Sequence, residues 1–320
     1  MKLSAVFFAN GLGDYLLTLP TLRALARALP TRLALITSDG PSELLFGDVG
    51  IDRVVSVPMW RPGASAARCF SASQAFHELG PVECLISLVP WHSASLAELA
   101  RLVRPAWSIG LHRDFDFCVL GDARDHAADL PFNVVRKFAP HLQISDFAHP
   151  FALPPESVAA AEDVRRAIGA NRRLLVVHEE TATEAKQWLP SRMHETLRVL
   201  TARHPDLFIV VASRHPPSFP IETLGEAAIS ITRISLSFFL ALIARADSFV
   251  GVDSIGLHVA DLWSIPAIGL FGPTRPEEWG FRFSDKGVHL DGRGSMHNIS
   301  VEQVVSAFSS LQMNGARQSL

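Results

Sequence analysis

Short apolar runs alternate along the chain with longer segments in which apolar residues recur at helical spacing. The runs that open the two halves, Leu3–Phe8 and Leu174–His178, are apolar at almost every position, as expected of strands buried on both faces of a parallel sheet. Further strands are predicted at Arg32–Thr37, Arg53–Pro58, Cys84–Leu88, Trp107–Leu111, Leu207–Ala212, Ile229–Ile231, Ser248–Val250 and Ala267–Phe271.

Helices are predicted between these strands. They cover Gly11–Leu29, Ser42–Phe46, Ser71–Glu78, Ser93–Leu102, Ser157–Ile168, Pro190–Arg203, Leu236–Ala244, Leu257–Trp263 and Ser300–Leu311. Strands that alternate with helices of this length indicate parallel sheets with crossover connections. The pattern predicts an α/β protein with two doubly wound, Rossmann-like domains facing a cleft.

The domain boundary is predicted near residue 155. The segment His149–Pro155 contains three prolines, which cannot continue a helix or a central strand. Residues 1–155 then form the first domain and residues 156–320 the second. No strand follows the last helix, which is expected to pack back onto the first domain.

Composition narrows the functional classes. The 320 residues are 48% hydrophobic and 19% charged, which describes a globular protein with a large core. A net charge of −3 gives no general attraction to nucleic acid. Cys69, Cys84 and Cys118 form no CxxC pair and are expected to be buried thiols in a reducing compartment. With no signal-like or membrane-spanning segment, the expected location is the cytoplasm.

The turn after Ser248–Val250 is the most informative segment. Asp253, Ser254, Gly256 and His258 crowd where this strand passes into the next helix. Ligands bind at the carboxyl edge of parallel strands, and N–H groups at a helix N-terminus attract phosphate. The turn therefore predicts an anion site, with an ordinary capped βαβ unit as the alternative.

Two other loops follow the first strand of each half. In the first half, Gly11 and Gly13 precede Asp14, which either caps the helix or serves as a carboxylate base in the cleft. The loop is not a dinucleotide fingerprint, because Leu16 stands where the GxGxxG pattern requires glycine. In the second half, Thr181, Thr183 and Lys186 offer donors suited to a diphosphate. A solvated polar loop, with Trp188 filling the core, is the alternative there.

Metal binding is not predicted. His178, His194 and His204 lack the HExxH spacing, and the other histidines are scattered singly, apart from His258.

Taken together, these loops resemble the ADP-heptose:lipopolysaccharide heptosyltransferases of glycosyltransferase family 9. The family's G-x-G-D-x-x-x-x-x-P matches Gly11, Gly13, Asp14 and Pro20, and its K-x-W-P resembles Lys186–Trp188 with proline one residue late. Its D-[ST]-G-x-x-H and L-F-G-P-T-x-P elements resemble residues 253–258 and 270–276.

The resemblance implies a GT-B glycosyltransferase that inverts the anomeric centre, with the acceptor on the first domain and an ADP-sugar on the second. It makes Asp14 the general base and Lys186 the cation on the departing diphosphate, with no cofactor and no obligatory metal. It implies the following further donor-site residues: Gly13, Thr181, Thr183, Ile234 beside adenine, Asp253 at the sugar, and Ser254, Gly256, Leu257 and His258 at the diphosphate.

The chain departs from the family pattern in several places. Ile255 stands in place of glycine, with Gly256 shifted by one position. Residues 214–217 hold no clear counterpart of the glutamate that often binds the ribose, and residues 87–92 do not reproduce the family's polar D-x-Q element. A nucleotide-sugar epimerase and a non-catalytic nucleotide-sugar binding protein therefore stay open as alternatives.

The expected partners are a nucleotide-sugar donor and a saccharide or lipid-linked saccharide acceptor, with no nucleic acid. Arg61 and Arg68 are expected to hold anionic groups of that acceptor, although isolated arginines are usually solvated. A lipid-linked acceptor would bring the protein to the inner face of the inner membrane.

Overall fold

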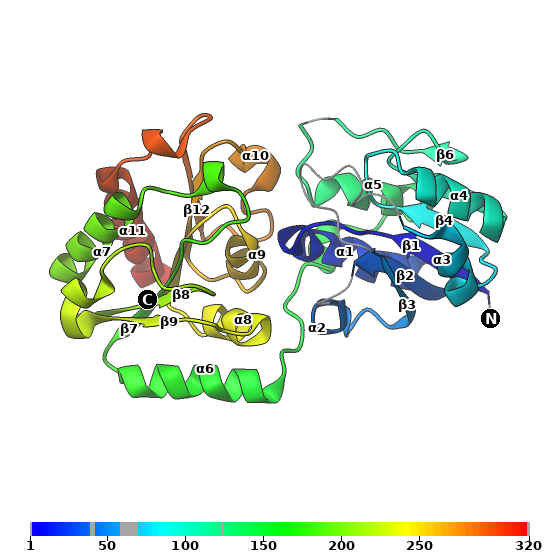
Figure 1. Ribbon diagram of the computed structural model, residues 1–320. Coiled ribbons are helices and arrows are strands. Elements are labelled where there is room, and N and C mark those ends of the chain that lie inside the picture. The colour runs from blue at the N-terminus through cyan, green and yellow to red at the C-terminus, as the bar shows by residue number, and fades with distance from the viewer. Residues whose placement is uncertain (1, 39–41, 58–69, 123, 319–320) are drawn as a thin grey trace. The chain divides into compact units, whose positions relative to one another are not determined.

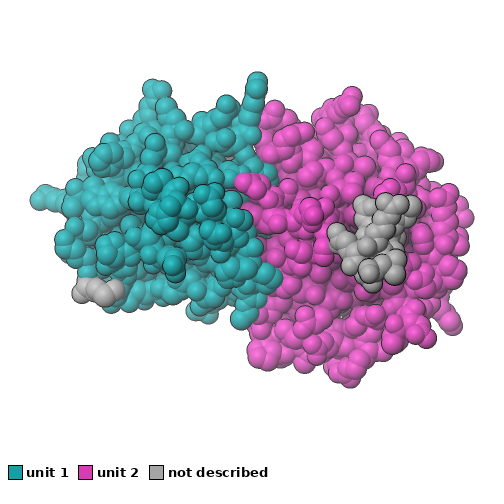
Figure 2. All heavy atoms as spheres, turned by 180° about the vertical axis from the view of Figure 1, so that it is seen from behind, with its two compact units in different colours: residues 1–152 teal, residues 153–320 magenta. Residues whose placement is uncertain are grey.

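The computed structural model describes residues 2–38, 42–57, 70–122 and 124–318. The chain divides into two compact units, Met1–Ala152 and Leu153–Leu320, which Figure 2 colours separately. Among the described residues, no helix combines the length and the hydrophobicity that a membrane crossing requires.

The first unit contains a six-stranded parallel sheet in the order β3-β2-β1-β4-β5-β6 (Figure 1). Its strands are β1 (Leu3–Phe7), β2 (Arg32–Ser38), β3 (Ile51–Val57), β4 (Cys84–Ser87), β5 (Trp107–Gly110) and β6 (Phe117–Cys118). Its helices are α1 (Leu12–Ala28), α2 (Ser42–Phe46), α3 (Ala72–Leu79), α4 (Ala94–Val103), α5 (Asp129–Phe138) and the short η2 (Ile144–Asp146).

The second unit repeats this plan with the sheet order β12-β11-β10-β7-β8-β9. Its strands are β7 (Arg173–His178), β8 (Leu207–Ala212), β9 (Ala228–Ile231), β10 (Ser248–Val252), β11 (Ala267–Phe271) and β12 (Gly287–Asp291). Its helical elements are α6 (Pro155–Ile168), η3 (Glu184–Lys186), α7 (Pro190–Arg203), η4 (Ile221–Ala227), α8 (Leu236–Ala244), α9 (Ile255–Leu262), α10 (Pro276–Trp279), η5 (Met296–Asn298) and α11 (Val301–Gln318).

The strands predicted from continuous apolar runs all form. Every residue of β1, β8, β10 and β11 is buried, so burial on both faces explains why these runs show no alternation. Both sheets are parallel throughout their described pairings. Two Rossmann-like α/β units are therefore confirmed.

The last helix belongs to the core of the second unit. Val304, Val305, Phe308 and Leu311 of α11 are buried in the core of the second unit, where the helix packs on α7, β11 and β12. The apolar side of α11 therefore covers its own sheet, and the expected contact with the first domain stays a prediction.

The cysteines also differ from expectation in part. Cys84 is buried, and burial raises the pKa of its thiol. The negative charge of nearby Glu83 raises this pKa further. Cys118 is only partly buried on β6. Cys69 lies outside the described residues.

Candidate functional site

The order of strands in the second unit creates a switch point between β7 and β10. Strands β8 and β9 lie on one side of β7, whereas β10, β11 and β12 lie on the other. The chain runs from β7 towards β8 and from β10 towards β11, on opposite sides of the β7–β10 pair. The loops at the carboxyl ends of β7 and β10 therefore diverge from each other. Ligands of open α/β sheets bind there.

Three polar side chains from three separate loops converge at this edge. Lys186 Nζ donates a hydrogen bond of 2.6 Å to Asp253 Oδ2, and Thr274 Oγ1 donates one of 2.7 Å to the same oxygen. The Asp253 side chain is only 5% exposed, whereas that of Lys186 is 26% exposed. The buried carboxylate is thereby paired and hydrogen-bonded, and the ammonium group retains access to solvent.

Local packing fixes the loop that carries Lys186. Two residues later, Trp188 is buried in the core, and its Nε1 donates to the carbonyl of Ile299 at 3.2 Å. Pro190 then begins α7, where proline is well tolerated because the first helical N–H has no intrahelical partner. The predicted role of Trp188 as a core residue is confirmed, and the residue also anchors this loop.

The Asp253 turn is tightly packed. A Cβ atom at Gly251 would lie 2.7 Å from the ring of Phe249, and one at Gly256 would lie 2.6 Å from it. Ser254 is the N-cap residue of α9, but its side chain makes no cap hydrogen bond, and its buried Oγ has no partner among the described residues. The helix thus begins at the switch point with an unused hydroxyl in its first turn.

The backbone donors predicted for a diphosphate are not all available. The Leu257 N–H already donates to the carbonyl of Ser254 at 3.1 Å, and the Leu257 side chain is buried. Any anion at this turn would therefore share that donor with the Ser254 carbonyl.

Two buried histidines flank the site. His178, at the end of β7, has Nδ1 2.7 Å from the carbonyl of Ala212 and packs on Phe239 with 4.6 Å between ring centroids. Burial lowers the pKa of His178, which favours a neutral ring that donates from Nδ1. His258 is buried within α9. Both residues support the fold around the switch point.

Two glutamates that the sequence interpretation left out tie the loop after β8 to the loop after β7. Glu180 accepts from the backbone N–H groups of Arg214 and His215, at 2.8 and 2.9 Å. Burial would raise the pKa of Glu180, but these hydrogen bonds outweigh it and the pKa is lowered. Glu179 accepts from the N–H and the hydroxyl of Ser218. Both carboxylates are therefore engaged in fixing a loop.

The side chains of Thr181, Thr183 and Ile234 make no described hydrogen bond to the Lys186–Asp253–Thr274 cluster. Thr181 Oγ1 accepts from the Thr183 N–H at 3.4 Å, and the Thr183 side chain is exposed. Ile234 is half-buried in the turn between β9 and α8. The backbone N–H of Lys186 donates to the carbonyl of Thr183 at 2.9 Å, so Thr183 begins the turn that carries Lys186. Thr274 belongs to the L-F-G-P-T-x-P element, which assigned it no role. The hydrogen bond to Asp253 is what places Thr274 at the site.

The glycine loop of the first unit occupies the equivalent place after β1. Asp14 is the third residue of α1, and its Oδ2 accepts from the Gly11 N–H at 3.2 Å. The capping geometry is therefore present. Gly13 and Asp14 are both half-buried, so the carboxylate is not sequestered in the core.

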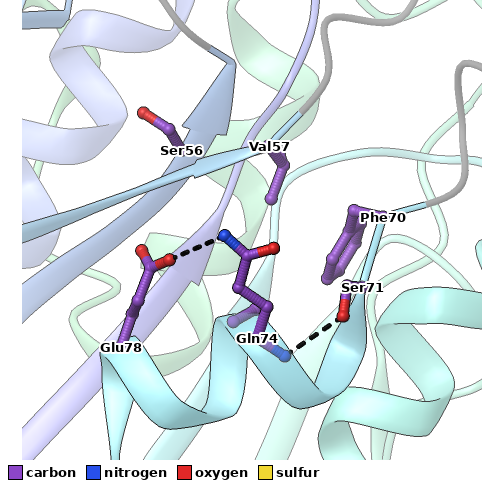
Figure 3. Close-up of a pocket in the computed structure, with 7 residues that line it drawn as sticks. Ser56, Val57, Phe70, Ser71, Gln74 and Glu78 are labelled. Atoms are coloured by element: carbon purple, nitrogen blue, oxygen red, sulfur yellow. Dashed lines mark hydrogen bonds between the residues drawn. The ribbon is translucent and has the colours of Figure 1, made fainter.

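The predicted acceptor residues, Arg61 and Arg68, lie outside the described residues. A cavity of about 320 Å³ in the first unit is lined by the end of β3 and the start of α3, at Ser56, Val57, Phe70, Ser71, Gln74, Ala75 and Glu78 (Figure 3). Arg136 of α5 forms an ion pair with Asp129 of its own helix at 3.4 Å. Its charge is thus balanced locally.

A family model described as glycosyltransferase family 9 (heptosyltransferase) matches residues 90–305, which is more than half of the 320 residues. No curated protein sequence matches the chain.

Several solved structures share the fold. The family 9 glycosyl transferase from Veillonella parvula DSM 2008 is 19% identical with a TM-score of 0.77, covering 98% of this chain and 97% of that chain. The ADP-heptose lps heptosyltransferase II of E. coli is 13% identical, with a TM-score of 0.71 and coverage of 99% and 100%. E. coli heptosyltransferase WaaC with ADP is 17% identical, with a TM-score of 0.68 and coverage of 97% and 99%. The predicted GT-B class of fold is confirmed.

Proposed function

Because the chain belongs to glycosyltransferase family 9 and is a glycosyltransferase, we propose that it transfers a heptose or related sugar from an ADP-sugar. The observation that carries this proposal is the Lys186–Asp253–Thr274 cluster at the switch point of the second sheet. The names of the similar structures, one with ADP and one an ADP-heptose transferase, support ADP as the nucleotide.

The charges at the cluster suit the loss of a nucleoside diphosphate. Breaking the bond to the anomeric carbon leaves negative charge on the departing phosphate, and fixed donors nearby lower the barrier. The half-exposed Lys186 ammonium supplies a positive charge, and the first turn of α9 supplies N–H groups and the Ser254 hydroxyl. We propose that these groups carry the charge without an obligatory metal ion at the diphosphate.

Asp253 suits a role at the sugar. Both of its described side-chain hydrogen bonds use Oδ2, so Oδ1 is the oxygen that would accept a sugar hydroxyl. Lys186 and Thr274 then fix the orientation of the carboxylate. Asp14 is the proposed base that takes the proton of the acceptor hydroxyl, and attack from the face opposite the diphosphate inverts the anomeric centre.

For the acceptor we propose a saccharide of the lipopolysaccharide core or a similar anionic saccharide. The family's description as heptosyltransferases supports this class. The roles of Arg61 and Arg68 in holding it stay predictions. A lipid-linked acceptor would bring the protein to a membrane through its substrate.

The decisive experiment measures ADP binding by calorimetry for the Lys186→Ala variant, and turnover of ADP-heptose with a saccharide acceptor. A charge-assisted hydrogen bond contributes about 1.5–3 kcal/mol, so ADP affinity is expected to fall by about 10- to 150-fold, and turnover with it. Thermal unfolding is recorded alongside because the change leaves the buried Asp253 without its cation.

Lys286→Ala is the matched control, since Lys286 is an exposed lysine of the same unit just ahead of β12. Unchanged ADP affinity and turnover in Lys186→Ala would remove this lysine from the site. Conversion of the nucleotide sugar without any acceptor would instead point to an epimerase.

A further inference from the structure

Two histidines and one aspartate of the first unit form a cluster that the function proposed above does not use. His92 Nδ1 lies 2.5 Å from Asp114 Oδ2, and His112 Nδ1 lies 2.9 Å from the same oxygen. One ligand atom from each residue lies within 4.8 Å of the other two. The two imidazole rings are tilted by 51° with 5.5 Å between their centroids, so both converge on the carboxylate.

The topology of the sheet brings these residues together. His92 lies in the loop after β4, whereas His112 and Asp114 lie in the loop after β5. Strands β4 and β5 are paired up to Ser87 and Gly110, so their carboxyl ends are adjacent. β4 also borders β1, where the strand order of this sheet reverses. The cluster therefore occupies the edge at which open α/β sheets bind ligands.

The loop that carries His112 and Asp114 is braced at its base. Ser108 donates to Asp116 Oδ2 through both its N–H and its hydroxyl, each at 2.8 Å, and the Asp116 N–H donates back to Ser108 Oγ. Phe115 folds against Gly110, where a Cβ atom would lie 2.5 Å from the ring. The two potential ligands thus stand on a closed, packed loop.

The other loop is fixed by a helix cap. Ser93 follows His92 and accepts from the Leu96 N–H at 3.3 Å as the N-cap of α4. The His92 side chain itself is 58% exposed, and those of His112 and Asp114 are each 30% exposed. A small ion can reach the cluster from solvent, and the backbone that presents the three ligands is held in place.

We propose that His92, His112 and Asp114 bind a divalent transition-metal ion of the zinc type. Two imidazole nitrogens and one carboxylate oxygen are ligands that such ions prefer, whereas Mg²⁺ and Ca²⁺ select sites made of oxygen alone. Three protein ligands leave further coordination positions for water. In the empty cluster, His92 Nδ1 is hydrogen-bonded to Asp114, whereas the buried Nδ1 of His112 lies near the same oxygen but has no hydrogen-bond partner among the described residues. A metal ion would give both nitrogens and the carboxylate a common partner.

The required movement is small. Tetrahedral bonds of roughly 2.0–2.1 Å hold ligand atoms about 3.3–3.4 Å apart. The Nδ1 atoms stand 2.5 and 2.9 Å from the Asp114 oxygen, so each separation must grow by less than about 1 Å. Rotation of the half-exposed His92 side chain provides much of this change without moving the core.

The test titrates the full chain, stripped with a chelator and dialysed, with Zn²⁺ in a calorimeter and with Co²⁺ in an absorption spectrometer. One equivalent of each ion is expected to bind, with a Co²⁺ spectrum of nitrogen and oxygen ligands. Loss of an outer-shell partner already lowers metal affinity by about 10- to 100-fold, so His92→Ala and Asp114→Asn should each lower it by at least about 100-fold.

His77→Ala is the matched control because His77 is an exposed histidine on α3 of the same unit. Circular dichroism checks that both cluster variants fold, and either folded variant decides the matter. The proposal is overturned if the stripped protein binds neither ion saturably, if either folded variant keeps the wild-type affinity, or if a thiolate-to-cobalt absorption band identifies a cysteine ligand. Because no sugar donor is involved, this result stands apart from the test of the transferase function.

Discussion

Asp14 illustrates how one side chain serves structure and chemistry together. Its carboxylate accepts from the Gly11 N–H in the first turn of α1, yet the residue is only half-buried. A carboxylate oxygen in the first turn of a helix can act either as a cap or as a proton acceptor. The two roles therefore have the same sequence signature, and no pattern of neighbouring residues could separate them.

We expect Asp14→Asn to lower transfer by about 10²–10⁴-fold, the usual contribution of a positioned general base. The amide oxygen of asparagine still accepts from the Gly11 N–H, so the melting temperature and ADP affinity should change little. The rate of sugar transfer and thermal unfolding are the two measurements. Wild-type transfer with a lowered melting temperature would identify Asp14 as a helix cap alone.

Other site residues differ in how far the sequence reveals them. Lys186 and Asp253 could be predicted because each belongs to a recognisable loop after a buried strand. The grouping of His92, His112 and Asp114 could not, since twenty residues and a whole helix separate the first two. Only the pairing of β4 with β5 brings them together.

Among the elements, the central strands and the edge strands β3 and β9 were predicted, whereas the edge strands β6 and β12 were not. β12 alternates between half-buried and exposed positions, and β6 spans only Phe117 and Cys118. Such edges bury too little apolar surface to leave a sequence pattern. Helix α5 has no counterpart among the predicted helices, and its Pro131 lies in the first turn, where proline is tolerated.

Helix α9 depends on glycine at its N-terminal turn. A Cβ atom at Gly256 would meet the fully buried Phe249 ring at 2.6 Å and Phe239 at 3.3 Å. Overpacking costs about 1–3 kcal/mol, and the better helix propensity of alanine offsets about 0.5–1 kcal/mol of it. We therefore expect Gly256→Ala to lower the free energy of unfolding by about 1–2 kcal/mol, measured by denaturant titration.

Ser254→Ala is the comparison for that measurement. The Ser254 hydroxyl is buried and has no hydrogen-bond partner among the described residues, so its removal should leave stability unchanged or slightly raised. Equal stability of Gly256→Ala and the wild type would mean that Phe249 moves aside without cost.

At the scale of the whole molecule, each unit holds its own sheet and core. The cluster of Lys186, Asp253 and Thr274, and the core that includes Trp188, come entirely from residues after Leu153. The proline-rich segment at residues 149–155 coincides with the division between the units, whereas the arrangement of the two units around a cleft stays a prediction.

We expect the fragment 153–320 to unfold cooperatively and to bind ADP within about tenfold of the full chain, a difference of at most about 1.4 kcal/mol. Circular dichroism and calorimetry measure the two properties, and the same fragment carrying Lys186→Ala is the control. A folded fragment that does not bind ADP would show that the first unit supplies part of the nucleotide site.

The bond between Lys186 and Asp253 also bears on discrimination among the anions of a cell. Without a ligand, the Lys186 ammonium is already paired with the buried Asp253 carboxylate. An anion that binds Lys186 must therefore compete with that carboxylate. Inorganic phosphate or chloride makes few contacts, so its binding energy offsets little of the cost of disturbing the Lys186–Asp253 pair. A nucleoside diphosphate brings a base, a ribose and two phosphates, and its many contacts together can outweigh the competition. Under the proposed function, the neutral Lys186–Asp253 pair would therefore disfavour the binding of abundant small anions at Lys186.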